Sequence, residues 1–375
     1  MRLLQGSILR QAEDEITPEH QIKLVWMFQK PVAEHPSRQT GPVSIFVAAS
    51  VQLPIQTMID DFQCLLLCGR ELRIYNLDTG ELVIKLREVM NQKMPFFGLN
   101  RPDHVVALSR SRMYVNMMNI AKGECVATFK VGEDRFLNSL TVSENGKTCV
   151  CGDDTQKVSA LLVWDLSQRK LMYDLRIPHH EFLTRFVAIT SEGHYVACVC
   201  REKEEHAVNF IVVYDLASGT LFKRWKPGAS SLALTISTPG GSVVAALEDA
   251  TVTANDLVTG NPRWLVKGHT YPADTIRVDP RGTFVLTYDS TGHDRAIRIW
   301  DMQTGASLSV WTPDSPVTAC EVSADSRCVV VALAGRADLI TLVIAHKTLP
   351  GLEDVKVDEK IYGNEENKGK EFELT

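Results

Sequence analysis

Short apolar runs, many of them rich in Val, Ile, Leu and aromatic residues, follow one another along most of the chain. Turn-forming clusters of Gly, Pro, Asp, Asn and Ser separate the runs. Short runs of β-branched and aromatic residues between such clusters are typical of β-strands. The pattern therefore predicts strands almost throughout, beginning with a strand over residues 22–28.

One unit of this pattern recurs along the chain. It consists of an apolar run, an aromatic residue or Asn followed by Asp or Asn, a short linker that usually ends in Gly, and a second apolar run. The key residues are Asn76, Asn119, Asp165, Asp215, Asp256 and Asp301, at successive spacings of 43, 46, 50, 41 and 45 residues. A period in the forties with paired strands predicts one four-stranded blade repeated around a ring. A single blade cannot bury both of its faces, so the closed array is the stable unit.

Two-residue signatures within the units resemble WD repeats: Trp164-Asp165, Trp300-Asp301, Tyr214-Asp215, Tyr75-Asn76 and Asn255-Asp256. The fullest match covers residues 268–301. Gly268-His269 opens it, a turn follows at residues 279–282, and Trp300-Asp301 closes it. The resemblance covers residues 22–345 and implies an all-β, seven-bladed WD-repeat β-propeller with four-stranded antiparallel blades.

The same resemblance implies a hydrogen-bonded brace of His269, Thr287, Asp294 and Trp300, with Asp289 as the alternative to Thr287. A buried imidazole, hydroxyl, carboxylate and indole N–H can satisfy one another without water, so this is structural chemistry. The other copies lack the Gly-His pair, and the fifth has Asn255 in place of Trp. We expect those blades to hold together mainly by apolar packing.

Seven inner strands are expected near residues 43–49, 96–100, 137–142, 182–189, 231–236, 274–278 and 317–322. The seventh blade continues at residues 328–333 and 339–344 but lacks a clear fourth strand, which residues 22–28 can supply. The alternatives are closure by residues 352–357, or a ring that is a fragment of a larger array. We expect residues 1–21 to be an extension or connector and residues 346–375 to be an acidic, disordered tail.

The net charge is −6, and residues 353–375 hold eight acidic residues against four lysines. The ring is thus nearly neutral, which argues against general nucleic-acid binding; a chromatin- or RNA-associated propeller would need a local basic rim. No apolar run reaches the roughly 20 residues that span a bilayer, so no membrane contact is predicted. Nine cysteines without a secretory signal fit a reducing cytoplasm.

The sequence holds only weak signals of a catalytic or metal site. Cys149 with Cys151, and Cys198 with Cys200, share strand faces, where buried packing and metal thiolates are alternatives. His179-His180-Glu181 is interpreted as a loop between blades, and residues 363–370 miss the phosphate-loop spacing. No nucleophile elbow occurs. We predict no enzyme activity, cofactor, metal or small-molecule substrate, and a propeller hydrolase would need convergent carboxylates or His in the central channel.

The connections from each outer strand to the next inner strand line one rim and vary in sequence. Aromatic and Arg residues there are typical interface anchors, and packing beneath the rim is the alternative. The chain is therefore predicted to be a scaffold for a protein or peptide partner. Repeats with Asn in place of Trp also resemble the propellers of NACHT-and-WD-repeat signalling ATPases, which implies a sensor or regulatory role. The candidate rim residues are Phe96, Phe97, Arg135, Phe136, Phe182, Arg185, Tyr271 and Asp274.

Overall fold

The computed structural model describes most of the chain between residues 22 and 346. The described residues are 22–31, 45–48, 63–68, 71–76, 82–87, 96–98, 104–119, 122, 124–130, 132, 135–153, 155, 159–177, 180–202, 209–322, 326, 328–334 and 338–346. Within these residues every regular element is a β-strand. This agrees with the all-β class that the apolar pattern predicts.

The described strands form seven four-stranded antiparallel sheets. Six of these sheets take four consecutive strands each, and the remaining sheet has the order β1-β28-β27-β26. In the first half of the chain the strands are β1 (Ile22–Pro31), β2 (Ile45–Ala48), β3 (Gln63–Cys68), β4 (Glu71–Asn76), β5 (Leu82–Arg87), β6 (Phe96–Gly98), β7 (His104–Leu108), β8 (Tyr114–Asn119), β9 (Glu124–Lys130), β10 (Leu137–Val142), β11 (Thr148–Asp153), β12 (Ala160–Asp165) and β13 (Lys170–Leu175). The second half contributes β14 (His180–Ile189), β15 (Tyr195–Glu202), β16 (Asn209–Asp215), β17 (Thr220–Trp225), β18 (Ser231–Ser237), β19 (Ser242–Leu247), β20 (Thr251–Asp256), β21 (Pro262–Lys267), β22 (Thr275–Val278), β23 (Phe284–Tyr288), β24 (Ile297–Asp301), β25 (Ser307–Trp311), β26 (Val317–Val322), β27 (Cys328–Leu333) and β28 (Asp338–His346).

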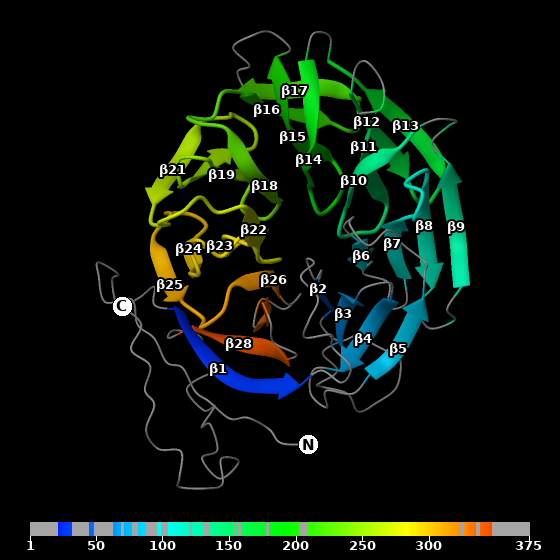
Figure 1. Cartoon of the computed structure of the whole chain (residues 1–375). Coiled ribbons are helices and arrows are strands. Elements are labelled where there is room, and N and C mark those ends of the chain that lie inside the picture. The colour runs from blue at the N-terminus through cyan, green and yellow to red at the C-terminus, as the bar shows by residue number, and fades with distance from the viewer. Residues whose placement is uncertain are drawn as a thin grey trace, which may run out of the picture.

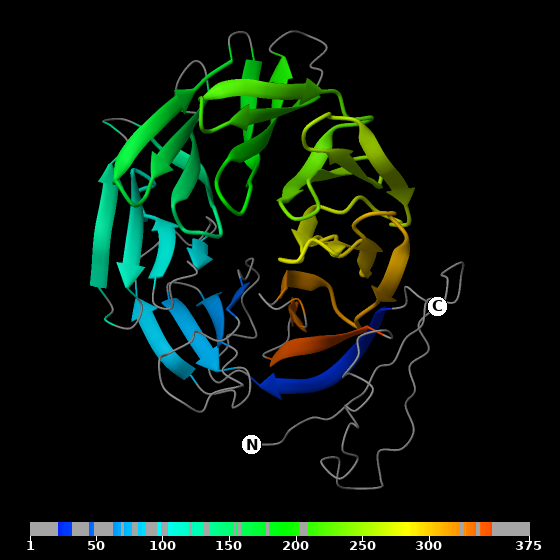
Figure 2. The ribbon, with the colours of Figure 1, turned by 180° about the vertical axis from the view of Figure 1, so that it is seen from behind.

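The sheets are arranged around a common axis, as Figures 1 and 2 show from opposite sides. The first strand of each consecutive sheet, such as β10 or β14, lies toward the centre, and the fourth, such as β13 or β17, lies on the outside. The middle strands are the most buried: all six residues of β19 are buried, whereas β13 alternates between exposed and half-buried positions. This arrangement is consistent with a propeller.

One sheet combines the two ends of the described chain. Strand β1 pairs antiparallel with β28, with Ile22 opposite His346 and Pro31 opposite Asp338. The N-terminal strand thus completes the sheet that β26 and β27 begin, and its position in Figure 1 is on the outside of that sheet. Residues 352–357, the alternative for this place, lie outside the described residues.

The outer strands share an irregularity in their pairing. Shortly after the turn that leads into each of them, one residue has no partner on the neighbouring strand, which defines a β-bulge. Bulges on edge strands increase local twist and discourage pairing with foreign strands. The bulge residues are Val83 on β5, Val126 on β9, Met172 on β13, Phe222 on β17, Arg263 on β21 and Leu308 on β25.

Neighbouring sheets are joined by aromatic rings that pack against turn glycines. Tyr173 of β13 covers Gly219 in the next sheet, and Trp264 of β21 covers Gly305. Both glycines have positive φ, +70° and +72°, and a Cβ atom added there would lie 2.5 Å and 2.9 Å from the ring atoms. Only glycine meets both demands without strain. The Trp264 indole N–H also donates to the backbone oxygen of Met302 over 2.8 Å.

The hydrophobic core lies between adjacent sheets. One cluster combines Val115 and Phe129 of the β6–β9 sheet with Leu140 and Leu162 of the β10–β13 sheet. Cys149 and Cys151 point to one face, with their Sγ atoms 3.6 Å apart and fully buried. Burial raises the pKa of the Cys149 thiol well above its ordinary value, so the thiols serve as small apolar side chains.

Candidate interaction surface

The sheet β22–β25 contains the polar brace. His269 precedes β22, Thr287 lies on β23, Asp294 lies in the loop before β24, and Trp300 lies on β24. The Trp300 indole N–H donates to Thr287 Oγ1 over 2.8 Å, and Thr287 Oγ1 lies 2.7 Å from His269 Nε2. His269 Nδ1 lies 2.9 Å from Asp294 Oδ2. These contacts form one chain if Nδ1 carries the proton, so that Nε2 accepts from the Thr287 hydroxyl.

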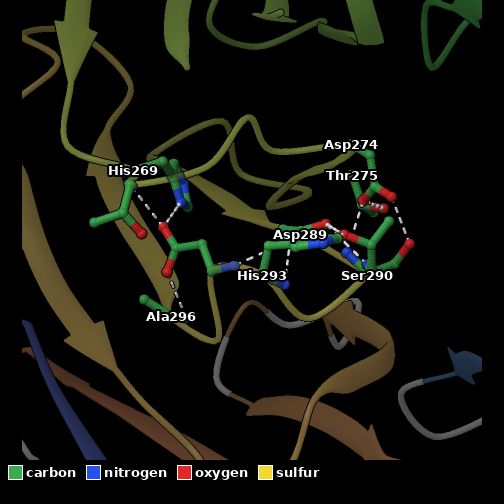
Figure 3. A network of polar contacts seen from close by, with 10 residues as sticks. His269, Asp274, Thr275, Asp289, Ser290, His293 and Ala296 are labelled. Carbon is green, nitrogen blue, oxygen red and sulfur yellow. Dashed lines mark hydrogen bonds and ion pairs between the residues drawn. The ribbon is translucent and has the colours of Figure 1, made fainter. Parts of the chain in front are cut away.

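Asp294 is the charged end of the brace. Burial by itself would raise the pKa of its carboxyl, but hydrogen bonds from His269 and from the backbone N–H groups of Ala296 and Thr270 lower it below its ordinary value. Asp294 Oδ2 lies 2.9 Å from His269 Nδ1, and Oδ1 accepts from the Ala296 backbone N–H over 2.9 Å; Figure 3 labels these two partners. The brace therefore holds a fully ionised carboxylate near neutral pH, which ties the connection before β22 to the loop before β24.

Two further carboxylates extend this network along the rim (Figure 3). Asp289 accepts hydrogen bonds from the backbone N–H groups of His293 and Asp294 at 2.8 and 3.0 Å, so it anchors the loop and Thr287 has the place in the brace. Asp274 accepts from the Thr275 hydroxyl and from the backbone N–H of Ser290, both at 2.9 Å. Asp274 thus serves the loop, and its carboxylate is engaged within the sheet.

Tyr271 lies on the connection between β21 and β22 and is 42% exposed. Its ring stacks on the imidazole of His293, with ring centroids 4.4 Å apart and an interplanar angle of 23°. Because His293 belongs to the loop that Asp289 anchors, the exposed aromatic pair rests on a fixed support. A rigid aromatic group with one open face loses little conformational freedom when it is covered.

Arg135 has a structural role that the repeat pattern missed. Its Nε atom lies 3.0 Å from Asp153, which is fully buried, and its Nη2 atom lies 3.0 Å from Asp174. Hydrogen bonds from Arg176, and then from Arg135, lower the pKa of the Asp174 carboxyl. In this sheet an ionic contact thus accompanies the apolar packing, because Arg135 ties the entry of the sheet to β11 and β13. The available sequence signal is a carboxylate, Asp153, at the end of an apolar strand.

The remaining candidates divide between surface and core. Phe136 is 39% exposed, and the Arg112 guanidinium lies 6.0 Å from the centre of its ring. Phe182 is only 4% exposed and packs edge-on against Tyr214, so its prediction as a surface anchor is corrected: the strand β14 turns its ring into the core. Phe96 and Phe97 lie on β6 and Arg185 on β14, but their side chains lie outside what the structure describes.

On the inner strands, Arg277 of β22 donates to Glu321 of β26 over 2.9 Å, so this carboxylate is paired with a cation of the neighbouring sheet. No group of three or more potential metal ligands converges in the described part of the chain. Its residues also include no helix of the length and hydrophobicity needed to span a membrane.

Comparison with known proteins gives a short match. No established protein family matches the chain. A segment of 94 residues, 25% of this chain, is 28% identical to eukaryotic translation initiation factor 3 subunit I of the fungus Phaeosphaeria nodorum. The match covers 27% of that protein, so the two are compared over only about a quarter of each.

Proposed function

We propose that the chain is a seven-bladed WD-repeat propeller in which β1 closes the ring, and that it is a non-catalytic scaffold for protein partners. The repeated unit, the four-stranded antiparallel sheets and the pairing of β1 with β28 support this architecture. The polar brace of His269, Thr287, Asp294 and Trp300 supports the assignment to WD repeats.

The scaffold function rests on one observation: exposed aromatic side chains stand on the connections between sheets, and polar networks fix those connections. Tyr271 stacks on His293 above the loop anchored by Asp289, and Phe136 follows Arg135, whose guanidinium binds two carboxylates. A partner that covers these rings pays little ordering entropy on the propeller side. We refer to Phe136, Tyr271 and His293 as the rim anchors.

The short match also favours a binding role. The name of the relative identifies it as one subunit of a larger factor. We carry over from it only the general expectation of protein partners. A sensor role within a signalling ATPase, and a cytoplasmic location, stay predictions.

The test is affinity purification with quantitative mass spectrometry. We compare the unmodified chain with Phe136→Ala and Tyr271→Ala, and use Val258→Ala as the control. Val258 is 59% exposed and lies on the turn between β20 and β21, at the opposite ends of the strands from Tyr271. We expect at least one protein to be lost from both rim variants and kept by the control. Identical captured proteins in all four samples would show that this rim is not the binding face.

A further inference from the structure

A second exposed surface lies on the outer wall of the ring, away from the rim. Bulge residues on three successive outer strands are apolar and exposed: Val126 on β9, Met172 on β13 and Phe222 on β17. Isolated exposed apolar residues are common, whereas a contiguous apolar surface indicates a binding site.

On the outer wall, the exposed apolar surface is continuous on β17. Leu221 is 48% exposed and Phe222 is 38% exposed, and the Phe222 ring packs against Tyr195 with a centroid distance of 5.1 Å. On β9 the exposed neighbour of Val126 is only the small Cys125, and on β13 the neighbours of Met172 are half-buried. We call Tyr195, Leu221, Phe222, Lys223, Arg224 and Lys226 the outer-wall patch. It spans both faces of the outer strand: Phe222 packs on Tyr195 on the face toward β18–β21, and Arg224 and Lys226 lie over Phe210 on the face toward β10–β13.

The outer-wall patch is strongly basic. Lys223, Arg224 and Lys226 follow directly on the two apolar residues, without an acidic residue between them. The Arg224 guanidinium lies 3.6 Å and the Lys226 ammonium 5.3 Å from the centre of the Phe210 ring. Glu202 offsets part of the Arg224 charge at 3.3 Å. Two cations of the outer strand are thus held over one aromatic ring.

The corresponding place on another sheet shows how such a position is covered. Leu308, the bulge residue of β25, is only 4% exposed and belongs to a core cluster with Ile340, Leu342 and Ile344 of β28. Strand β1, paired to β28, passes beside β25 (Figure 1). An extended segment that packs alongside an outer strand thus accompanies the burial of a bulge side chain. The bulge in β17 itself disfavours direct addition of a further strand.

We propose that the outer-wall patch binds an extended acidic segment of a partner protein, which packs apolar side chains on Leu221 and Phe222 and directs carboxylates toward Lys223, Arg224 and Lys226. Apolar contact supplies the anchor, and charge complementarity selects an acidic sequence. The outer-wall patch is separate from the rim anchors, so an experiment can disprove binding at one of them without disproving binding at the other.

The probe is a fluorescein-labelled peptide of eight residues that alternates Glu and Phe, titrated with the full chain and followed by fluorescence anisotropy. The control peptide has Lys in place of each Glu. We expect saturable binding of the acidic peptide, and about tenfold weaker binding for Phe222→Ser and for the double variant Lys223→Ser with Lys226→Ser. Raising the salt concentration from 0.05 to 0.5 M should also weaken binding. Tyr271→Ala, on the rim, should bind as the unmodified chain does.

Equal binding of the acidic and basic peptides, or unchanged binding by Phe222→Ser, would overturn the proposal. Two outcomes would reassign the occupant and so also overturn it. If a free peptide of residues 353–375 binds more tightly than the probe and is sensitive to Phe222→Ser, the acidic tail of this chain is the ligand. If sedimentation shows a dimer that Phe222→Ser dissociates, a second copy is the ligand. Melting curves of each variant verify that the sheet remains folded.

Discussion

Replacing Thr287 by Val should destabilise the chain although the two side chains have almost the same shape. The Thr287 hydroxyl connects the Trp300 indole N–H, at 2.8 Å, to His269 Nε2, at 2.7 Å, and is fully buried. Valine leaves one buried donor and one buried acceptor without a partner. Each such group costs about 1–3 kcal/mol, so we expect a loss of about 2–6 kcal/mol. At roughly 2 °C per kcal/mol for a large domain, the Tm should fall by about 4–12 °C.

The chain offers a matched control in Thr251→Val. Thr251 is 1% exposed, like Thr287, but its hydroxyl has no hydrogen-bond partner among the described residues. Replacing an unpaired buried hydroxyl by a methyl group should leave stability unchanged or raise it slightly. The same substitution at two buried threonines therefore predicts opposite results, and differential scanning fluorimetry distinguishes them.

A double-mutant cycle with Trp300→Phe tests the mechanism. In the phenylalanine background no indole N–H remains to be left unpaired, so Thr287→Val should cost less by about 1 kcal/mol or more. Equal melting of Thr287→Val and Thr251→Val would refute the reasoning, because the brace would then contribute nothing measurable. Additive effects of Thr287→Val and Trp300→Phe would show that the two side chains are energetically independent.

Three other expectations concern charge and backbone strain. The pKa of Asp294 is lowered in the folded state, so its contribution to stability is present above the ordinary pKa near 3.9 and is lost as pH falls toward the folded value. In denaturation experiments across pH 3–7, Asp294→Asn should therefore be most destabilising near neutrality. A difference in stability that does not change with pH would contradict this. Arg135→Met should cost about 3–5 kcal/mol of stability, because it leaves the buried Asp153 without its cation. Adding Asp153→Leu should restore most of the lost Tm. A double variant no more stable than the single one would argue against the ionic contact. Arg169 has a positive φ of +56°, in a turn like the one in which Gly219 has a φ of +70°. Arg169→Gly should therefore stabilise the chain by about 0.5–1 kcal/mol in urea denaturation. A loss of stability would show that the Arg169 side chain matters more than its backbone strain.

The strands could be predicted because the same apolar pattern recurs in each repeat. Residues 137–142 and 317–322 form strands over the expected ranges, and the expected strand at residues 328–333 is β27. The brace residues could be proposed from one well-preserved copy, since His269 and Trp300 stand at recognisable spacings. Apolar periodicity carries such information locally, along a single strand or hairpin.

What could not be predicted depends on contacts between distant strands. Asp153 resembles any turn carboxylate until Arg135 and the depth of burial are seen together. Phe182 is of a residue type common among interface anchors, and only the register of β14 against β15 directs its ring inward. The positive φ of Arg169 is equally hidden, because the turn conformation is imposed by the two strands that it joins.

The pairing of Ile22 with His346 has a consequence for biosynthesis. During translation β1 leaves the ribosome long before β28 exists, and it must wait as an unpaired strand until β28 has been made. The sheets made of consecutive strands can form as they appear, so in the closed ring that we propose the nascent chain passes through a stage that is open at one seam. A chaperone that shields a single extended strand would act on this protein at that stage and would leave when the last sheet forms.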